Sequence, residues 1–538
     1  MTEKRIFDKD VEYIKDMDLR RAALRGGCIQ MKQYGGNSGM LDKKNFMKLQ
    51  NGSDVRGVAL AAPGEEVTLT SEAVNRIAGA FAALLAKRSG KKLQEMVIAV
   101  GMDSRVTAPI FLHETLQALE AAGVRALDCG LASTPAMFMS TILPETHADG
   151  SVMLTASHLP FNRNGMKFFT AEGGFEKSDI TELLELAAET PARSVKEMPH
   201  HPCALIERYS RLLREKISSE LGGEAKPLTG MHIVVDAGNG AGGFFATEVL
   251  APLGADISGS LYLEPDGKFP NHVPNPEDAA AMEAIRGAVL QNKADLGLIF
   301  DTDVDRMSAV LPDGRELNRN ALIAMMAALL APDYPGSTIV TDSVTSDELT
   351  EFLEKELGLV HHRYMRGYKN VINECRRLNE SGTVSPLAIE TSGHGALKEN
   401  YYLDDGAFLA VKLVIAAARL QREGRPLAKL VEKLAEPAET HEYRLYIRGV
   451  EDVRSYGVMV LDKFAERAKE LGIKLAEPSY EGVRLILPQG WALLRMSLHD
   501  PNMPLNVEGR TKGSVAAISC QLRTLLRDLD CLDTTPLA

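Results

Sequence analysis

The chain has 538 residues, 45% of them hydrophobic and 25% charged, and its formal net charge is −12. This length exceeds what one hydrophobic core supports, so we expect three or four domains, and the acidic balance argues against a general nucleic-acid binder. The N-terminus lacks the apolar core of a signal peptide, and no apolar run is long enough to span a membrane. Six cysteines without CxxC spacing predict reduced thiols in a cytoplasmic protein.

The first part of the chain predicts an extension followed by a helix. Residues 1–50 read as a charged helix and a glycine-rich segment. An alanine-rich helix is expected over about 71–88, with Ser71 as its N-cap.

Three short β-rich runs, at 97–100, 233–235 and 339–340, each end in a small polar loop and lead into helical periodicity. This strand–loop–helix pattern predicts three related α/β domains. The C-terminal part has expected strands at 442–447 and 483–487, which indicate a smaller α+β domain. Proline-rich and turn-forming segments predict an N-terminal extension and four domains, at 1–50, 51–202, 203–314, 315–436 and 437–538.

One polar loop between two apolar runs has the residue types of a covalent catalyst. The run Val152–Leu154 leads into Thr155-Ala156-Ser157-His158, and Lys167 lies in the second run. A hydroxyl at a sheet edge, beside an imidazole and within reach of a lysine, can carry a covalent group. A turn whose side chains only bond to their own backbone is the alternative.

The strongest local pattern is the apolar run 296–300 followed by Asp301-Thr302-Asp303-Val304-Asp305-Arg306. Three carboxylates at alternate positions after a buried strand gather the hard oxygen ligands that Mg²⁺ needs, and without a cation they would repel one another. An EF-hand would need Gly and Glu where Arg306 and Pro312 stand, so that interpretation fails.

Two further clusters predict binding rather than chemistry. Glu390-Thr391-Ser392-Gly393-His394 has side chains suited to a polyol, although a self-satisfied turn is about as probable. The arginine and serine side chains of 495–502 suit phosphate. No Walker sequence or Rossmann glycine fingerprint follows a strand, which disfavours a P-loop kinase or an NAD enzyme.

Taken in order, these pieces resemble the α-D-phosphohexomutase family, which includes the phosphoglucomutases and phosphomannomutases. The resemblance extends from about Asn51 to Glu508. Its landmarks are the segments 53–57, 101–105, 155–158, 236–243, 265–272, 301–306, 390–394 and 495–506.

The resemblance implies an α/β protein of four domains around a central cleft: three similar α/β/α units with mixed sheets and a smaller C-terminal α+β domain. It implies that Ser157 carries a phosphoryl group and that one Mg²⁺ is held by that group with Asp301, Asp303 and Asp305. The implied catalytic residues are Ser157, Lys167, His394, Arg56 and Arg306. The implied substrate-binding residues are His158, Lys369, Glu390, Ser392, Arg495, Ser497 and His499.

The sequence departs from the family pattern in the phosphate loop, where Leu498, His499 and Asp500 replace Gly, Thr and Glu. We expect His499 to replace the lost threonine hydroxyl. Thr302 and Val304 stand where glycine is usual, and Leu159 where asparagine is usual. These changes leave the expected metal ligands intact but bear on substrate preference.

The sequence therefore predicts a cytoplasmic, Mg²⁺-dependent isomerase that interconverts hexose 1-phosphate and hexose 6-phosphate, with glucose or mannose as the sugar, through a hexose 1,6-bisphosphate intermediate. The expected partner is a small phosphosugar, with no nucleic acid or membrane, and the expected state is a monomer or homodimer. The alternatives are a mutase for glucosamine or pentose phosphate, a non-catalytic phosphosugar-binding protein, and a phosphatase.

Overall fold

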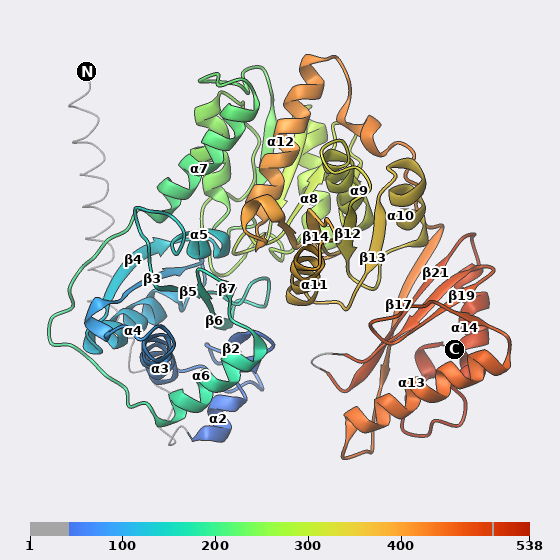
Figure 1. Cartoon of the computed structure of the whole chain (residues 1–538), viewed down its shortest axis with the longest axis horizontal. Helices are drawn as coiled ribbons and strands as arrows, with labels where there is room; N and C mark the ends of the chain where they lie inside the picture. The colour runs from blue at the N-terminus through green and yellow to red at the C-terminus, as the bar shows by residue number, and fades with distance from the viewer. Residues whose placement is uncertain (1–41, 498–499, 538) are drawn as a thin grey trace.

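The computed structural model describes residues 42–497 and 500–537, and the described strands form four sheets, one for each of four domains (Figure 1). The predicted helix and glycine-rich segment before residue 42 lie outside the described residues, as does His499. Three mixed sheets and one C-terminal antiparallel sheet confirm the predicted fold class.

Domain I has a sheet in the order β1-β2-β6-β5-β3-β4, in which β3 is parallel to β4 and β5, while β6 is antiparallel to β5 and β2. Its strands are β1 (Gln50–Asn51), β2 (Asp54–Val58), β3 (Val97–Met102), β4 (Arg125–Leu131), β5 (Gly150–Leu154), β6 (Arg163–Thr170) and β7 (Gly173–Gly174). Its helices are α2 (Lys43–Met47), α3 (Ser71–Ser89), α4 (Ala108–Ala121), α5 (Thr134–Met139) and α6 (Lys177–Glu189).

Helix α3 matches the predicted helix, but its N-cap is Thr70 and not Ser71. The Thr70 side chain accepts a hydrogen bond from the Ala73 backbone N–H, 3.1 Å away, and Ser71 is the first helical residue. Thr70 and Ser71 both carry a hydroxyl that can cap a helix. Thr70 is the cap because its backbone is extended, as an N-cap requires.

Domains II and III repeat the mixed pattern, with parallel strands followed by antiparallel ones. Domain II comprises β8 (Ile233–Asp236), β9 (Leu296–Phe300), β10 (Met307–Val310), β11 (Glu316–Leu317), α7 (Leu205–Glu220) and α8 (Ala279–Asn292). Domain III comprises β12 (Thr338–Thr341), β13 (Val360–Arg363), β14 (Leu387–Ile389), β15 (Gly395–Leu397), β16 (Leu403–Asp404), α9 (Arg319–Leu330), α10 (Asp347–Glu351), α11 (Tyr368–Glu380) and α12 (Gly406–Arg422).

Domain IV is an antiparallel sheet in the order β17-β21-β20-β19-β18 with two long helices. Its elements are β17 (Glu439–Tyr446), β18 (Lys474–Leu475), β19 (Val483–Leu487), β20 (Gly490–Leu494), β21 (Asn502–Gly509), α13 (Val453–Glu470) and α14 (Ser514–Leu525). These elements agree with the strands and the α+β class predicted for this part of the chain.

The predicted domain boundaries stay predictions, but two elements bear on them. Helix α2 lies inside the predicted extension and buries Phe46 in the core of domain I. Strand β11 pairs with β10 of domain II, although it lies beyond residue 314.

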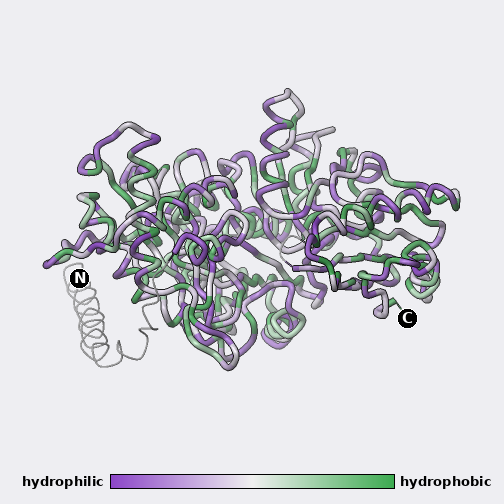
Figure 2. Tube along the Cα trace, turned by 90° about the horizontal axis from the view of Figure 1, so that it is seen from below, coloured by the Kyte–Doolittle hydropathy of each residue, from purple (hydrophilic) through white to green (hydrophobic). Residues whose placement is uncertain are grey.

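Domains I, II and III contact one another through a common hydrophobic core, whereas domain IV has a core of its own. A single apolar cluster includes residues of domains I, II and III, whereas domain IV has a separate cluster around Leu445, Phe464 and Leu505. In Figure 1 the domains follow one another around an arc with domains I and IV at its two ends. None of the described helices could cross a bilayer, and Figure 2 shows hydrophilic residues interspersed along the chain in every domain.

Candidate active site

All four domains line one large cleft of about 1910 Å³. Ser157 comes from domain I, Arg306 from domain II, Glu390 from domain III and Arg495 from domain IV. Each of these residues follows or ends a buried strand, so the cleft collects loops from four different sheets.

The serine loop (residues 155–163) joins β5 to β6, and Ser157 is buried within it. The Ser157 hydroxyl donates a hydrogen bond to Asp301 Oδ2 over 2.9 Å and lies 3.2 Å from Nδ1 of His158. The Ser157 backbone has a φ of +50°, a region that non-glycine residues rarely adopt. The loop thus directs a hydroxyl from domain I onto a carboxylate of domain II.

The acidic loop (residues 301–306) follows the fully buried strand β9. Asp301, Asp303 and Asp305 are all buried, and one carboxylate oxygen from each lies within 4.8 Å of the others. Oδ1 of Asp303 and Oδ1 of Asp305 are buried and have no hydrogen-bond partner. Burial, followed by the charges of Asp303 and Asp305, raises the pKa of Asp301 well above its usual range.

This donor set fits a divalent cation. Three carboxylates, two of which have an oxygen without a hydrogen-bond partner, provide the hard ligands that Mg²⁺ prefers. Burial and the neighbouring carboxylates of Asp303 and Asp305 raise the pKa of Asp301, and a bound cation would favour its charged form.

Lys167 reaches the same cluster from β6 of domain I. Its Nζ lies 2.8 Å from Asp303 Oδ2 and 2.5 Å from Asp305 Oδ2. Burial by itself lowers the pKa of Lys167, but the attraction of Asp303 and Asp305 outweighs burial and raises the pKa well above its usual range. Lys167 is therefore an ammonium ion at neutral pH.

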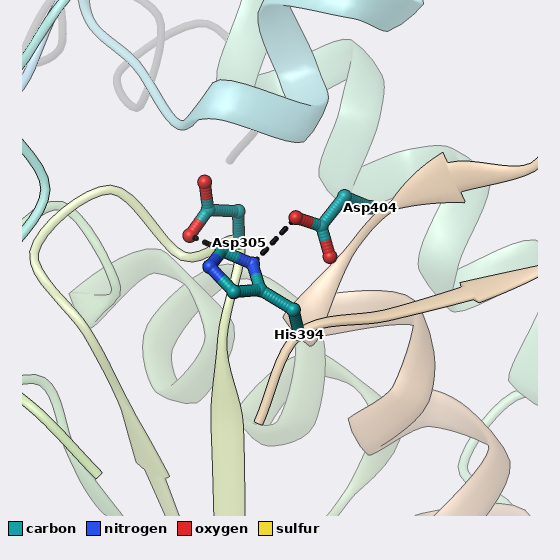
Figure 3. A group of neighbouring side chains, drawn as sticks. All are labelled: Asp305, His394 and Asp404. Atoms are coloured by element: carbon teal, nitrogen blue, oxygen red, sulfur yellow. Dashed lines mark ion pairs between the residues drawn. The ribbon is translucent and has the colours of Figure 1, made fainter. Parts of the chain in front are cut away.

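His394 lies between two acidic side chains, as Figure 3 shows. Its Nδ1 is 2.5 Å from Asp404 Oδ2 and 3.7 Å from Asp305 Oδ1, and its Nε2 accepts a hydrogen bond from Nε of Arg306 over 2.8 Å. The ring of Tyr368 stacks on the imidazole with centroids 5.0 Å apart. Burial lowers the pKa of His394, but Asp404 and then Asp305 outweigh burial and raise it.

Two arginines flank the serine and acidic loops. Arg56 on β2 forms an ion pair with Asp54 at 2.8 Å. The backbone N–H of Arg306 donates to Asp301 Oδ1 over 3.2 Å, and its Nη1 lies 3.6 Å from Glu277 Oε2.

His158 lies beside these arginines and lines the cleft. Burial, followed by the positive charges of Arg306 and Arg56, lowers the pKa of His158 to about 2. The imidazole is therefore neutral at every physiological pH.

The domain III residues predicted to bind substrate are buried at the cleft wall. Glu390 Oε1 accepts a hydrogen bond from the Gly367 N–H over 2.6 Å, and Ser392 Oγ donates to Glu390 Oε2 over 3.4 Å. Burial and the nearby Asp342 raise the pKa of Glu390 to about 7.

Lys369 lines the cleft but contacts domain I. Its Nζ donates to the Gly174 carbonyl oxygen over 2.6 Å and lies 3.4 Å from Glu176 Oε1. Lys369 therefore connects domain III to domain I across one end of the cleft.

The domain IV residues Arg495 and Ser497 lie at the opposite wall. Arg495 Nη1 is 3.6 Å from Glu481 Oε1, and burial lowers the pKa of Arg495. The Ser497 hydroxyl accepts a hydrogen bond from the Asp500 N–H over 3.1 Å. The cleft thus brings together the predicted catalytic and substrate-binding residues of all four domains, apart from His499, which lies outside the described residues. The three aspartates are buried next to the cleft and connect to it through Ser157 and Lys167.

Sequence reasoning missed several groups that hold this cleft in shape. Asp404 pairs with His394, and the Thr134 hydroxyl donates to Asp303 Oδ2 over 2.5 Å. The guanidinium of Arg105 contacts the serine loop. Arg105 lies in the family landmark 101–105, but neither Asp404 nor Thr134 carries a local pattern. Asp404 reaches His394 through the pairing of β15 with β16, and Thr134, at the start of α5, reaches Asp303 across the boundary between domains I and II.

Comparison with known proteins gives a consistent result over most of the chain. Residues 47–193, 207–314 and 318–438 match, in order, the alpha/beta/alpha domains I, II and III of phosphoglucomutase/phosphomannomutase. A phosphomannomutase/phosphoglucomutase of Pseudomonas aeruginosa is 28% identical over 482 residues, which cover 89% of this chain and 95% of that protein. A phosphoglucosamine mutase of Chromohalobacter salexigens is 29% identical, covering 86% and 95% of the two chains.

Solved structures agree in fold. A phosphoglucomutase/phosphomannomutase family protein of Burkholderia thailandensis is 26% identical with a TM-score of 0.74, covering 91% of this chain and 98% of that one. The open form of parafusin, a phosphoglucomutase of Paramecium, is 15% identical with a TM-score of 0.67, covering 91% and 95%, which supports the fold alone.

Proposed function

Because the chain belongs to the phosphoglucomutase/phosphomannomutase family, and is therefore a phosphohexomutase, we propose that it interconverts the 1- and 6-phosphates of glucose or mannose through a phosphorylated Ser157 and a hexose 1,6-bisphosphate. The observation that carries the proposal is the contact between Ser157 Oγ and Asp301 Oδ2, which joins a hydroxyl that lines the four-domain cleft to a buried acidic cluster.

The metal in this proposal is one Mg²⁺ held by Asp301, Asp303 and Asp305 together with an oxygen of the phosphoserine. When bound, it would withdraw electron density from the transferring phosphoryl group and neutralise its charge.

The proposed transfer breaks the bond between Ser157 Oγ and phosphorus and forms a bond from phosphorus to the free sugar hydroxyl. Ser157 Oγ gains a proton and the sugar hydroxyl loses one, and Lys167 and His394 are the candidates for moving these protons and orienting the sugar. Since Lys167 is an ammonium ion at neutral pH, its role is that of proton donor. Arg56 and Arg306 supply positive charge to the transferring group.

The remaining predicted residues bind the part of the substrate that does not react. Glu390 and Ser392 form hydrogen bonds with sugar hydroxyls. His158 and Lys369 line the same cleft. Arg495, Ser497 and His499 hold the second phosphate, whose binding energy lowers the barrier at the reacting one. Reversal of the bisphosphate in the cleft then presents its other phosphate to Ser157.

The test supplies purified protein with Mg²⁺, a trace of hexose 1,6-bisphosphate, and glucose 1-phosphate, mannose 1-phosphate or glucosamine 1-phosphate in parallel. We expect 6-phosphate from glucose or mannose without release of inorganic phosphate. Exclusive use of the amino sugar would contradict the proposed sugar, release of inorganic phosphate alone would indicate a phosphatase, and binding without any product would indicate a binding protein.

Ser157→Ala should lose turnover completely, because no other group at this position can carry the phosphoryl. The matched control is Ser210→Ala, which alters an equally buried serine on α7, outside the cleft. Full activity of Ser157→Ala would refute the phosphoserine mechanism.

A further inference from the structure

Arg105 is a buried arginine whose guanidinium faces the backbone of the serine loop. Nη2 donates to the carbonyl oxygens of Ser157 and Leu159, the latter over 2.6 Å. Nη1 donates to those of Pro160 and Arg163 over 2.8 and 2.9 Å. One side chain therefore binds four carbonyls of a single loop, and the side chain itself is fully excluded from solvent.

The charge of Arg105 is compensated on the opposite side by Asp103. Asp103 Oδ2 lies 3.3 Å from Arg105 Nε, and Asp103 Oδ1 accepts a hydrogen bond from the Arg105 backbone N–H over 2.9 Å. The fixed fork of guanidinium donors can serve several acceptors at once, which the single ammonium of lysine cannot reproduce.

A loop of domain II, residues 265–272, packs against Arg105 from outside. Gly267 pairs with the Arg105 backbone, and a Cβ at Gly267 would lie 2.3 Å from the Ser104 carbonyl oxygen. The ring of Phe269 lies 5.3 Å from the Arg105 guanidinium carbon. This close approach requires glycine and leaves Arg105 held between two domains.

The backbone of Ser157 needs such support. Its φ of +50° is unfavourable for a residue with a side chain, and conformations of this kind persist only where the surroundings enforce them. Arg105 binds the Ser157 carbonyl oxygen itself, so it constrains the peptide that orients the Ser157 side chain toward Asp301.

We propose that Arg105 is a positioning residue for phosphoryl transfer, which holds the serine loop so that Ser157 Oγ faces the acidic cluster, and that the domain II loop 265–272 keeps Arg105 in place. The proposal rests on the function proposed above. It assigns a role in the reaction to residues that touch neither substrate nor metal.

The main test is Arg105→Lys, which keeps the charge beside Asp103 but loses most of the carbonyl contacts. We expect kcat per phosphorylatable Ser157, counted by intact mass after incubation with hexose bisphosphate, to fall on the order of 10²-fold, with KM within about twofold of the wild type. A purely structural role would lower the amount of active protein but leave kcat per site unchanged, and that result would overturn the proposal. Arg163→Ala is the control, because its half-buried side chain pairs with Glu65 in the segment after β2, while its backbone carbonyl remains available to Arg105.

Gly267→Ala tests the same arrangement without altering a buried charge, and it decides the question if Arg105→Lys does not fold. We expect a drop in kcat per site with unchanged KM, because the added methyl pushes the domain II loop off Arg105. Wild-type kcat in folded Gly267→Ala would contradict the proposal. If Ser157→Ala itself remains active, the phosphoserine mechanism fails; if only the Arg105 and Gly267 variants remain active, the positioning role alone fails.

Discussion

The acidic cluster has a charge distribution that a bound divalent cation would compensate. Asp301, Asp303 and Asp305 contribute three carboxylates, and Lys167 contributes one ammonium ion in contact with two of them. The raised pKa of Asp301 is the physical sign of the remaining negative charge. A divalent ion bound here would lower that pKa and favour the carboxylate form of Asp301.

Asp303→Asn should weaken activation by Mg²⁺, because it removes one charged ligand from this cluster. The expected result is a rise in the Mg²⁺ concentration for half-maximal activity, measured by titrating metal into metal-depleted enzyme. Asp236→Asn is the control, since Asp236 is equally buried at the end of the neighbouring strand β8 but pairs with His272. An unchanged Mg²⁺ requirement in Asp303→Asn would remove Asp303 from the metal site.

Asp404→Asn should lower the pKa of His394, because the Asp404 carboxylate stabilises the imidazolium form. The change can be followed by NMR of histidine-labelled protein over a pH series. Asp405→Asn is a close control, since the adjacent Asp405 side chain binds the Tyr209 hydroxyl instead. Equal His394 titration in the two variants would show that Asp404 does not set the protonation of this ring.

At the scale of helices and strands, the positions of the strands could be predicted more easily than the contacts between residues at the strand ends. The apolar runs before Asp301 and before Thr155 matched β9 and β5, because a fully buried strand has an unmistakable composition. Ser157, Lys167, Asp301 and His394 could then be selected as residues that follow or lie in such strands, with the family resemblance supplying their roles.

What the sequence could not predict is how side chains from different strands and loops meet. The pairing of Asp404 with His394 depends on the antiparallel register of β15 with β16. The contact between Arg105 and the serine loop depends on which strands neighbour one another in domain I. The resemblance implied that Lys369 binds the substrate, and the sequence carried no sign that its Nζ contacts Gly174 of domain I.

The cap of α3 allows a direct test at this scale. Thr70→Ala should reduce the free energy of unfolding by about 0.5–2 kcal/mol, because it leaves the Ala73 N–H without its side-chain acceptor. Ser71→Ala should change stability by less than about 0.5 kcal/mol, since Ser71 is only the first helical residue. Urea unfolding of both variants distinguishes the two residues. A larger loss of unfolding free energy in Ser71→Ala than in Thr70→Ala would show that Ser71 is the N-cap.

At the scale of the molecule, domain IV is attached to domain III by polar contacts rather than by a shared core. Arg484 donates to the carbonyl oxygens of Ser343 and Thr345 and to Asp347 of domain III, over 3.0 to 3.2 Å. The Arg484 guanidinium carbon also lies 3.7 Å from the centre of the Trp491 ring. A contact of this kind can separate more easily than the apolar cluster shared by domains I, II and III.

This interface should weaken as pH rises. Burial raises the pKa of Glu508 to about 8, and repulsion from Glu348 adds to the effect; Glu508 also accepts a hydrogen bond from Trp491 Nε1 over 2.6 Å. Because the folded pKa exceeds that of the unfolded chain, the stabilisation is complete below about pH 4.5 and is lost as pH rises through about 8.

The melting temperature of domain IV should therefore fall between pH 5 and 9 more steeply in the wild type than in Glu508→Gln. The glutamine keeps an acceptor for Trp491 but cannot ionise. Differential scanning calorimetry at several pH values gives both slopes, with Glu477→Gln, an exposed position of the same domain, as control. Parallel slopes in the wild type and Glu508→Gln would exclude Glu508 as the titrating group.

Because domain IV has a separate core, its loops can change independently of the loops in domains I and II. The loops around Ser157 and Asp301, where the proposed phosphoryl transfer takes place, belong to domains that share an apolar core. The loop after Arg495 belongs to domain IV, which has a core of its own. Under the proposed function, substitutions in that loop would alter which phosphosugar binds without changing the contacts between Ser157 and the acidic cluster. A change of sugar preference would then require substitutions in one loop only. The residues at 498–500, which differ from the family pattern, belong to that loop in the sequence.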